Sequence, residues 1–138
     1  MKILLDAMGG DNAPDANIKG AIKAIKEIKS EIVLVGNEKI IKSRIKELYG
    51  KESISEISDR ITIKNATETI EMEDIPTQAI KHKKDSSMVV GFKMLKEDEG
   101  DVFISAGNSG ALLTRSNINS RKNKRSRQTS NCTNASII

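Results

Sequence analysis

The sequence predicts an α/β protein, with a Rossmann-like parallel sheet and helices on both faces. Short apolar runs alternate along the chain with longer amphipathic segments, as expected when each strand is followed by a crossover helix. Residues 32–35 are apolar at every position and are closed by Gly36, a pattern typical of a strand that is buried on both faces of a parallel sheet. The first apolar run ends in a glycine turn that leads directly into a helical pattern, as in many folds of this class.

The strands are recognised as apolar runs between polar or glycine residues, and the helices by apolar positions at i, i+3 and i+4. Asn37 is the expected N-cap and Gly50 the expected stop of the second helix, and Asp85 with the two serines after it begins the third. Another helix is expected to begin at Ala111, whereas residues 67–84 are mixed and polar. The expected strands cover residues 2–7, 32–35, 60–66 and 102–104, and the first three helices cover residues 15–29, 38–49 and 87–99.

Charge divides the chain after Thr114. The 138 residues are enough for one domain, and their formal net charge is +4. The last 24 residues carry six basic residues and no acidic one, so the basic character of the chain belongs to this tail. Because residues 115–138 show no apolar periodicity, they are expected to be disordered or loosely helical, whereas residues 1–114 form the folded part.

The sequence contains no pattern for secretion, disulfides or a membrane span. Only three strongly apolar residues separate Lys2 from Asp6, so no signal peptide is expected. Cys132 is the single cysteine, which excludes a disulfide framework and a cysteine metal site. No apolar stretch approaches the roughly 20 residues that span a bilayer, and a cytoplasmic location is therefore expected.

The first candidate site is the turn from Asp6 to Pro14, which reads Asp-Ala-Met-Gly-Gly-Asp-Asn-Ala-Pro. Gly9 and Gly10 allow positive φ and the close approach of a ligand to the backbone. The helix that follows offers unpaired N–H groups and a partial positive charge to an anion. With Asp6 and Asp11 on either side of its glycines, the turn is a candidate anion site, and an ordinary strand-to-helix turn is the alternative.

A second glycine turn follows the fourth expected strand and contains Ser105, Gly107, Asn108, Ser109 and Gly110. Its hydroxyl, amide and backbone groups can donate to phosphate or carbonyl oxygens without a P-loop lysine. It fits neither the P-loop nor the dinucleotide-binding pattern. Although a structural loop is the alternative, two such turns at strand ends of one sheet favour a shared anion site.

The third candidate is the run Lys83, Lys84, Asp85, Ser86 and Ser87, in which two cations precede a helix start that bears two hydroxyls. This pattern suits a phosphate or an acidic partner that carries phosphopantetheine. A solvated charge run leading into a capped helix is the alternative.

Two further features point weakly to chemistry. His82 is the only histidine and has no nucleophile pattern beside it. The acidic residues 71–74 fit a solvated loop better than a metal site. No metal site is therefore predicted.

Four segments together resemble the phosphate acyltransferases of fatty-acid and phospholipid synthesis. They are residues 6–14, 70–80, 83–88 and 105–111, and they match motifs of that family in order and spacing. The resemblance covers residues 1–114, which correspond to the N-terminal part of an α/β acyltransferase domain. It implies a phosphotransacetylase-like fold, truncated in this chain.

Members of this family transfer an acyl chain from acyl carrier protein to inorganic phosphate, without a cofactor. The acyl phosphate is then used by a membrane glycerol-3-phosphate acyltransferase, so the family belongs to phospholipid biosynthesis. The resemblance also implies homodimers that are cytoplasmic or peripheral at the membrane surface. This shorter chain is expected to be inactive.

Phosphate is itself a nucleophile, so the reaction needs groups that hold phosphate, polarise the thioester carbonyl and stabilise the leaving thiolate. Asn108 and Ser109 are the candidate donors to phosphate or the oxyanion, and Lys84 is the candidate for neutralising charge. Asp6 and Asp11 are expected to orient cationic or amide groups, because a carboxylate repels phosphate. Asn108 is expected at a solvent-facing strand end, outside the core. The remaining substrate-binding candidates are Gly9, Gly10, Asp85, Ser86, Ser87, Ser105, Gly107 and Gly110.

The tail departs from the family after Thr114. When residues 115–134 are back-translated with chosen wobble bases and read one base later, the product is Gly-Ala-Thr-Leu-Ile-Val-Gly-Arg-Ile-Lys-Gly-Val-Asp-Arg-Gln-Ala-Ile-Ala-Pro-Met. This reading resembles the continuation of the family, although its fit fades over the last four residues. A one-base frameshift therefore explains the basic tail without assigning it a function.

Two other functions are compatible with parts of the sequence. A small basic module on an α/β scaffold could contact nucleic acid through residues 121–127, but aromatic side chains do not alternate with the basic ones there. A different phosphate-handling enzyme of the same architecture is the second alternative, and ester hydrolysis in place of acyl-phosphate formation would distinguish it.

Overall fold

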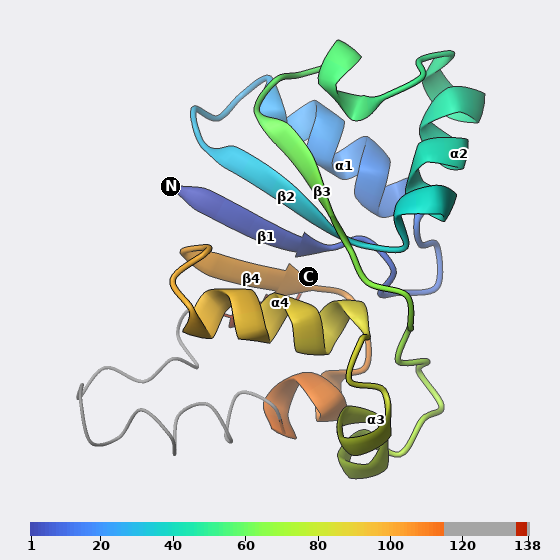
Figure 1. Cartoon of the computed structure of the whole chain (residues 1–138), viewed down its shortest axis with the longest axis vertical. Helices are drawn as coiled ribbons and strands as arrows, with labels where there is room; N and C mark the ends of the chain where they lie inside the picture. Colours follow the sequence, from blue (N-terminus) through green and yellow to red (C-terminus); the bar gives the residue numbers. More distant parts are fainter. Residues whose placement is uncertain (115–134, 138) are drawn as a thin grey trace.

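The computed structural model describes residues 1–114 and 135–137, which form one parallel sheet with the strand order β3-β2-β1-β4-β5 (Figure 1). This arrangement confirms the predicted α/β fold, and each predicted strand is present with its ends displaced by at most one residue. The parallel pairing places all carboxyl ends at one edge, where β1 lies between β2 and β4. The strands are β1 (Lys2–Asp6), β2 (Glu31–Gly36), β3 (Ile61–Asn65), β4 (Val102–Ser105) and β5 (Ala135–Ile137).

Helices cover both faces of the sheet, as the sequence predicts. α1 and α2 lie on one face and α4 lies on the other (Figure 1). The strand order explains this division: the chain moves outward from β1 to β3 and then returns to the other side of β1. Right-handed crossovers in opposite directions place their helices on opposite faces. The helices are α1 (Asp15–Ile25), α2 (Glu38–Tyr49), α3 (Pro76–His82) and α4 (Ser87–Lys96), with a 3₁₀ turn η1 (Ile54–Glu56).

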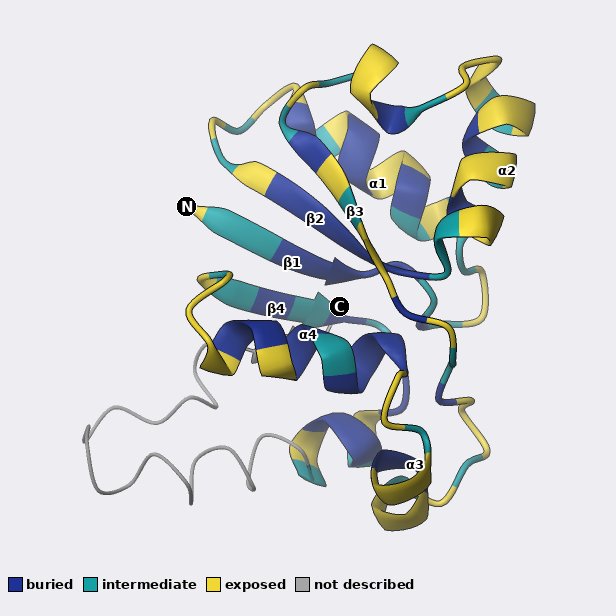
Figure 2. Cartoon of the chain, in the orientation of Figure 1, coloured by how far each residue is buried: buried dark blue, intermediate teal, exposed yellow. Residues whose placement is uncertain are grey.

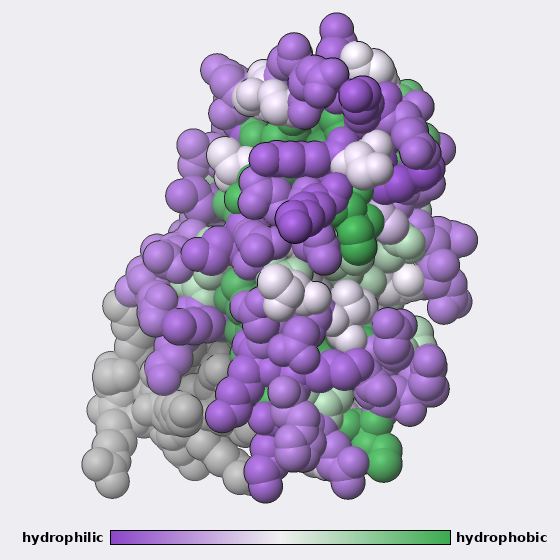
Figure 3. Space-filling view, turned by 45° about the vertical axis from the view of Figure 1, so that its right-hand side comes forward, coloured by the Kyte–Doolittle hydropathy of each residue, from purple (hydrophilic) through white to green (hydrophobic). Residues whose placement is uncertain are grey.

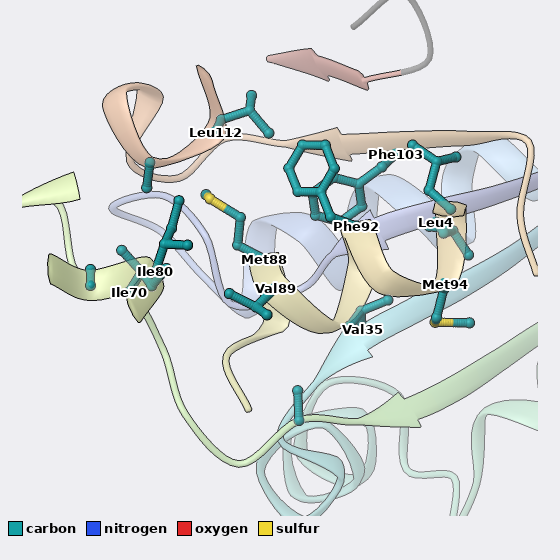
Figure 4. Close-up of a cluster of buried hydrophobic side chains, with 14 of the residues drawn as sticks. Leu4, Val35, Ile70, Ile80, Met88, Val89, Phe92, Met94, Phe103 and Leu112 are labelled. Atoms are coloured by element: carbon teal, nitrogen blue, oxygen red, sulfur yellow. The ribbon is translucent and has the colours of Figure 1, made fainter. Parts of the chain in front are cut away.

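Alternate residues along the strands supply two separate cores. Leu4 of β1 packs with the α4 layer, whereas Leu5 packs with α1 and α2. In the α4 layer the rings of Phe92 and Phe103 lie 5.1 Å apart between centroids (Figure 4). A Cβ at Gly91 would lie 2.3 Å from the Phe103 ring, so the glycine allows α4 to approach β4. Figure 2 shows the buried strand centres and the exposed outer helix faces.

The structure differs from the sequence prediction at several element ends. α3 is a helix within the segment predicted to be irregular, and only Ala79 and Ile80 of it are buried, so its apolar period is too short to recognise. Residues 109–114 are helical, a start two residues earlier than expected, and α1 ends at Ile25, before residue 29.

The predicted disordered tail falls mostly on residues 115–134, which lie outside the described residues. Its residues 135–137 form β5, which pairs with β4. Among the residues described, no helix is long and apolar enough to cross a membrane. The face in Figure 3 is mainly hydrophilic.

Candidate functional site

The two glycine turns meet where the chain leaves β1 and β4 in opposite directions. From β1 it continues to α1 on one face, whereas from β4 it continues to the helical residues 109–114. Ala111 and Leu112 of this segment pack in the same core as α4, on the other face. Such a topological switch point at the carboxyl edge of a parallel sheet is the usual ligand site in α/β folds.

The turns touch each other through their backbones. A Cβ at Gly9 would lie 2.8 Å from the Gly107 nitrogen and 2.7 Å from Asp6 Oδ2, so no larger residue fits there without displacing one of the turns. Gly10 has φ of 101° and lies beside Ala106. Gly9 therefore allows the close approach of the two turns and Gly10 a left-handed backbone, as the sequence predicts.

Asp6 is the buried centre of this region. Its Oδ1 accepts hydrogen bonds from Ser87 Oγ at 2.5 Å and from the Met8 N–H at 3.1 Å, and its Oδ2 accepts from Ser105 Oγ at 2.8 Å. Ser105 Oγ in turn accepts from the Gly107 N–H at 3.0 Å. Burial raises the pKa of Asp6, and the hydrogen bonds only partly oppose that rise. One carboxyl group thus joins the end of β1, the start of α4 and the end of β4.

Asn17 fixes the first turn and was not a sequence candidate. Its amide donates to the carbonyls of Asp6 at 3.2 Å, Ala7 at 2.9 Å and Gly9 at 2.9 Å. The available signal was an amide in the first turn of a helix, between positions of the apolar stripe. Such an amide is also common on a solvated face, so the residue type alone does not reveal its role.

Asn108 is buried, and the expectation that it faces solvent is wrong. Its Nδ2 donates to the carbonyls of Glu71 at 3.1 Å and Asp74 at 3.0 Å, and its Oδ1 accepts from the Ala111 N–H at 3.0 Å. The side chain therefore caps the helical residues 109–114 and holds the acidic loop. Because these partners use its amide, Asn108 is a structural anchor here, and its assignment as a catalytic donor has no geometric support.

The two lysines of the third candidate segment have different surroundings. Lys83 Nζ contacts Asp74 Oδ2 at 2.6 Å and the Thr69 carbonyl at 2.8 Å, and this ion pair lowers the pKa of Asp74. Lys84 is exposed and bonds to no other described residue. Only Lys84 is thus available to a ligand.

The polar residues after these lysines, Asp85, Ser86 and Ser87, also have different hydrogen-bond partners. Asp85 accepts from the Thr67 N–H at 2.9 Å and from the Thr67 hydroxyl, and these bonds lower the pKa of Asp85. Ser86 is fully buried and caps α4 by accepting from the Val89 N–H. Of this group, the structure joins only Ser87 to Asp6 and the glycine turns.

The polar groups that remain available to a ligand lie in the first glycine turn and at the start of the helical residues 109–114. Within the described chain, the N–H groups of Gly10, Asp11 and Asn12 make no hydrogen bond. Ser109 is exposed, whereas a Cβ at Gly110 would lie 2.6 Å from Pro76, so that glycine serves packing. In residues 1–114 and 135–137, no cluster of three or more potential metal ligands is found.

A groove of about 510 Å³ opens beside the first turn, between α1 and the sheet. Gly9 and Gly10 lie at one part of its wall, with Asp11 and Asn12 beside them. Most of the remaining lining is apolar. The candidate anion turn therefore adjoins an apolar trough.

A family model described as fatty acid synthesis protein matches residues 1–132. The chain belongs to this family. Membership confirms the resemblance drawn from the four motifs, and the match continues past Thr114. The basic segment proposed for nucleic acid lies among the residues that the structure does not describe, and the family match gives that alternative no support.

The relatives of this fatty acid synthesis family member include proteins named phosphate acyltransferase. The relative from Acetivibrio thermocellus is 55% identical over 115 residues, which are 83% of this chain and 32% of the relative. Those from Alkaliphilus oremlandii and Clostridioides difficile are each 48% identical, over 82% of this chain and 32% of the relative. The chain thus spans about a third of the length of these relatives.

Proposed function

We propose that this chain supplies the phosphate-binding edge of a phosphate acyltransferase, which transfers an acyl group from acyl carrier protein to inorganic phosphate. The relatives named phosphate acyltransferase support this reaction class. The observation that carries the proposal for this chain is the contact between two glycine turns at the switch point, held by Asp6, Ser87 and Ser105.

In the proposed reaction, a phosphate oxygen attacks the thioester carbonyl carbon. The carbon–sulfur bond breaks, the thiolate leaves on the carrier protein, and an acyl phosphate forms. The unused N–H groups of Gly10 and Asp11, together with the N-terminus of α1, are suited to hold phosphate. Ser109 and Lys84 are the exposed side chains that can add a donor and a positive charge.

Asp6 is a positioning residue in this proposal. Because it is buried and bonded to protein groups, it does not reach phosphate. It keeps the two turns in register, so that their donors are already oriented when phosphate arrives. Preorganised donors of this kind need no rearrangement during the reaction.

The cellular location, oligomeric state and downstream partner are proposed from the family resemblance. We propose a cytoplasmic enzyme that forms homodimers and delivers acyl phosphate to a membrane glycerol-3-phosphate acyltransferase. The proposal includes no cofactor and no metal.

Phosphate titration of the isotopically labelled chain, followed by amide NMR, tests the site. We expect saturable shifts at the amides of residues 9–12 and 107–109, and no such shifts with chloride at equal ionic strength. Ser105→Ala should weaken phosphate binding, because it removes the acceptor of the Gly107 N–H and one donor to Asp6. The matched control is Ser43→Ala on the exposed face of α2. Equal phosphate affinity in both variants, or shifts confined to other residues, would reject the site.

A further inference from the structure

We infer that the groove between α1 and the sheet binds the hydrocarbon chain of the acyl donor; this inference rests on the proposed function. The groove adjoins the glycine turn proposed for phosphate and has a volume of about 510 Å³. This volume lies within the range of about 300–1,000 Å³ that is typical of small-molecule sites.

The groove exists because one face of α1 carries very small residues. Ala16, Gly20 and Ala24 recur at four-residue spacing and line the trough, whereas Ile18 and Ile22 of the same helix are buried against the sheet. The small face leaves room above the strands. Ile3 and Ile104 line that space and are only half-buried, although they come from neighbouring central strands.

The polarity of the lining matches an acyl chain with a polar head. Among the lining residues that the structure describes, Asp11 alone is charged, and it lies in the glycine turn. The Asn17 amide is already bonded to carbonyls of that turn, so it does not offer its donors to the trough. Away from Asp11, the described lining carries no charge, which disfavours ionic partners and favours a hydrocarbon. The unused N–H groups at the end of the trough suit an anionic or carbonyl head.

This placement also meets the need of the reaction. The thioester carbonyl must lie beside phosphate, and the attached chain must leave that point along an apolar surface. The groove runs from the glycine turn along the sheet, so a chain placed in it has its reacting end at Gly10 and Asp11. A helix of a second copy is the competing occupant, because small residues at four-residue spacing also allow close helix packing.

Gly20 provides a direct test. A Cβ at this position meets no atom within 4 Å, so Gly20→Leu extends a side chain into open space and replaces a poor helix former. Ala16→Leu is a second blocking variant from the exposed groove wall. The matched control is Lys23→Leu, which places the same side chain on the same helix, outside the groove lining.

The measurement uses the whole chain and displacement of a fluorescent long-chain fatty acid by octanoate, dodecanoate and hexadecanoate. We expect affinity to rise about fourfold per methylene while the groove has room. Gly20→Leu and Ala16→Leu should each weaken hexadecanoate binding by about tenfold, since each fills space that one or two methylenes would use. Lys23→Leu should bind like the parent chain, with circular dichroism confirming the fold of every variant.

Two results would overturn the inference. One is a fatty-acid affinity that does not change with chain length, or that is equal in Gly20→Leu and Lys23→Leu. The other is a dimer in solution that Gly20→Leu dissociates, which would show that a second copy fills the groove. Phosphate shifts at the Gly10 and Gly107 amides, measured on the same samples, separate this inference from the proposed function. If phosphate binds but fatty-acid affinity does not depend on chain length, the groove is rejected and the phosphate turn is upheld. If fatty-acid affinity rises with chain length but phosphate causes no shifts, the phosphate turn is rejected and the hydrocarbon site is upheld.

Discussion

At the scale of single residues, Asn108 shows how one amide can join two segments. It caps the helical residues 109–114 and bonds to the backbone of the acidic loop more than thirty positions earlier. The residue type fits both this role and a ligand-binding role. The carbonyls that it bonds to come from a distant segment, so the sequence alone does not distinguish the roles.

Asn108→Ala is expected to lower the free energy of unfolding by about 2 kcal/mol. The substitution removes a helix cap and leaves carbonyls of the loop without their donor. Asn108→Ser is the control, because a serine retains a capping oxygen but is too short to reach the loop. Urea unfolding should place Asn108→Ser between the parent chain and Asn108→Ala. Unchanged stability in both variants would show that the anchor is unimportant.

Asp6 predicts a specific dependence of stability on pH. Burial raises its pKa above the ordinary value of an aspartate, so the folded chain binds this proton more tightly than the unfolded chain. The stabilisation due to protonation is complete below the unfolded pKa and is lost as pH rises through the folded pKa. The lowered pKa values of Asp74 and Asp85 give the opposite slope at acid pH, so a comparison with a variant is needed.

Asp6→Asn removes this titration. We expect the free energy of unfolding of the parent chain, relative to that of Asp6→Asn, to fall as pH rises from about 4 towards 7. Urea unfolding of both chains at a series of pH values measures the difference. Parallel curves over that range would mean that Asp6 has an ordinary pKa in the folded chain.

At the scale of elements, the contact between the two glycine turns decides the geometry of the site. Gly9→Ala places a methyl group at 2.7 Å from Asp6 Oδ2 and 2.8 Å from the Gly107 nitrogen. We expect about 1–3 kcal/mol of destabilisation and weaker phosphate binding, because the turns must separate. Gly20→Ala is the control: its methyl group meets nothing within 4 Å, so it should stabilise α1 by about 0.5–1 kcal/mol. If Gly9→Ala and Gly20→Ala had equal effects on thermal unfolding and on phosphate affinity, the contact between the turns would be unimportant.

The strands and long helices were predictable because their signals are local. Residues 32–35 are continuously apolar, and α1 repeats isoleucine and alanine over three turns. α3 was missed because its seven residues bury only two side chains. The bonds from Asp6 to Ser87 and Ser105 join residues 81 and 99 positions apart, and no local pattern specifies which hydroxyl meets the carboxyl group. The sequence therefore predicted which turns meet, but not which side chains face a ligand.

At the scale of the whole molecule, the helix after β4 determines how the α4 face is completed. Ala111 and Leu112 are buried against the α4 core. A helix that continues this face needs apolar residues near positions 115, 116, 118 and 119, where the chain has Arg115, Ser116, Ile118 and Asn119. The reading shifted by one base supplies glycine, alanine, leucine and isoleucine there. We propose that the shifted reading, and not the basic tail, is the sequence that completes this face.

A chain of equal length that carries the shifted reading after Thr114 should therefore be more stable. Because the parent chain already has Ile118 where the shifted reading has leucine, the new burial is mainly that of the isoleucine in place of Asn119. It would raise the free energy of unfolding by about 2 kcal/mol. Urea unfolding of the two chains measures this difference. A third chain, with the shifted segment shuffled so that its apolar residues fall on the opposite helix face, controls for composition and should show little gain. If the shifted and shuffled chains unfold at the same urea concentration as the parent, the segment after Thr114 does not complete this core, and the frame proposal loses its structural basis.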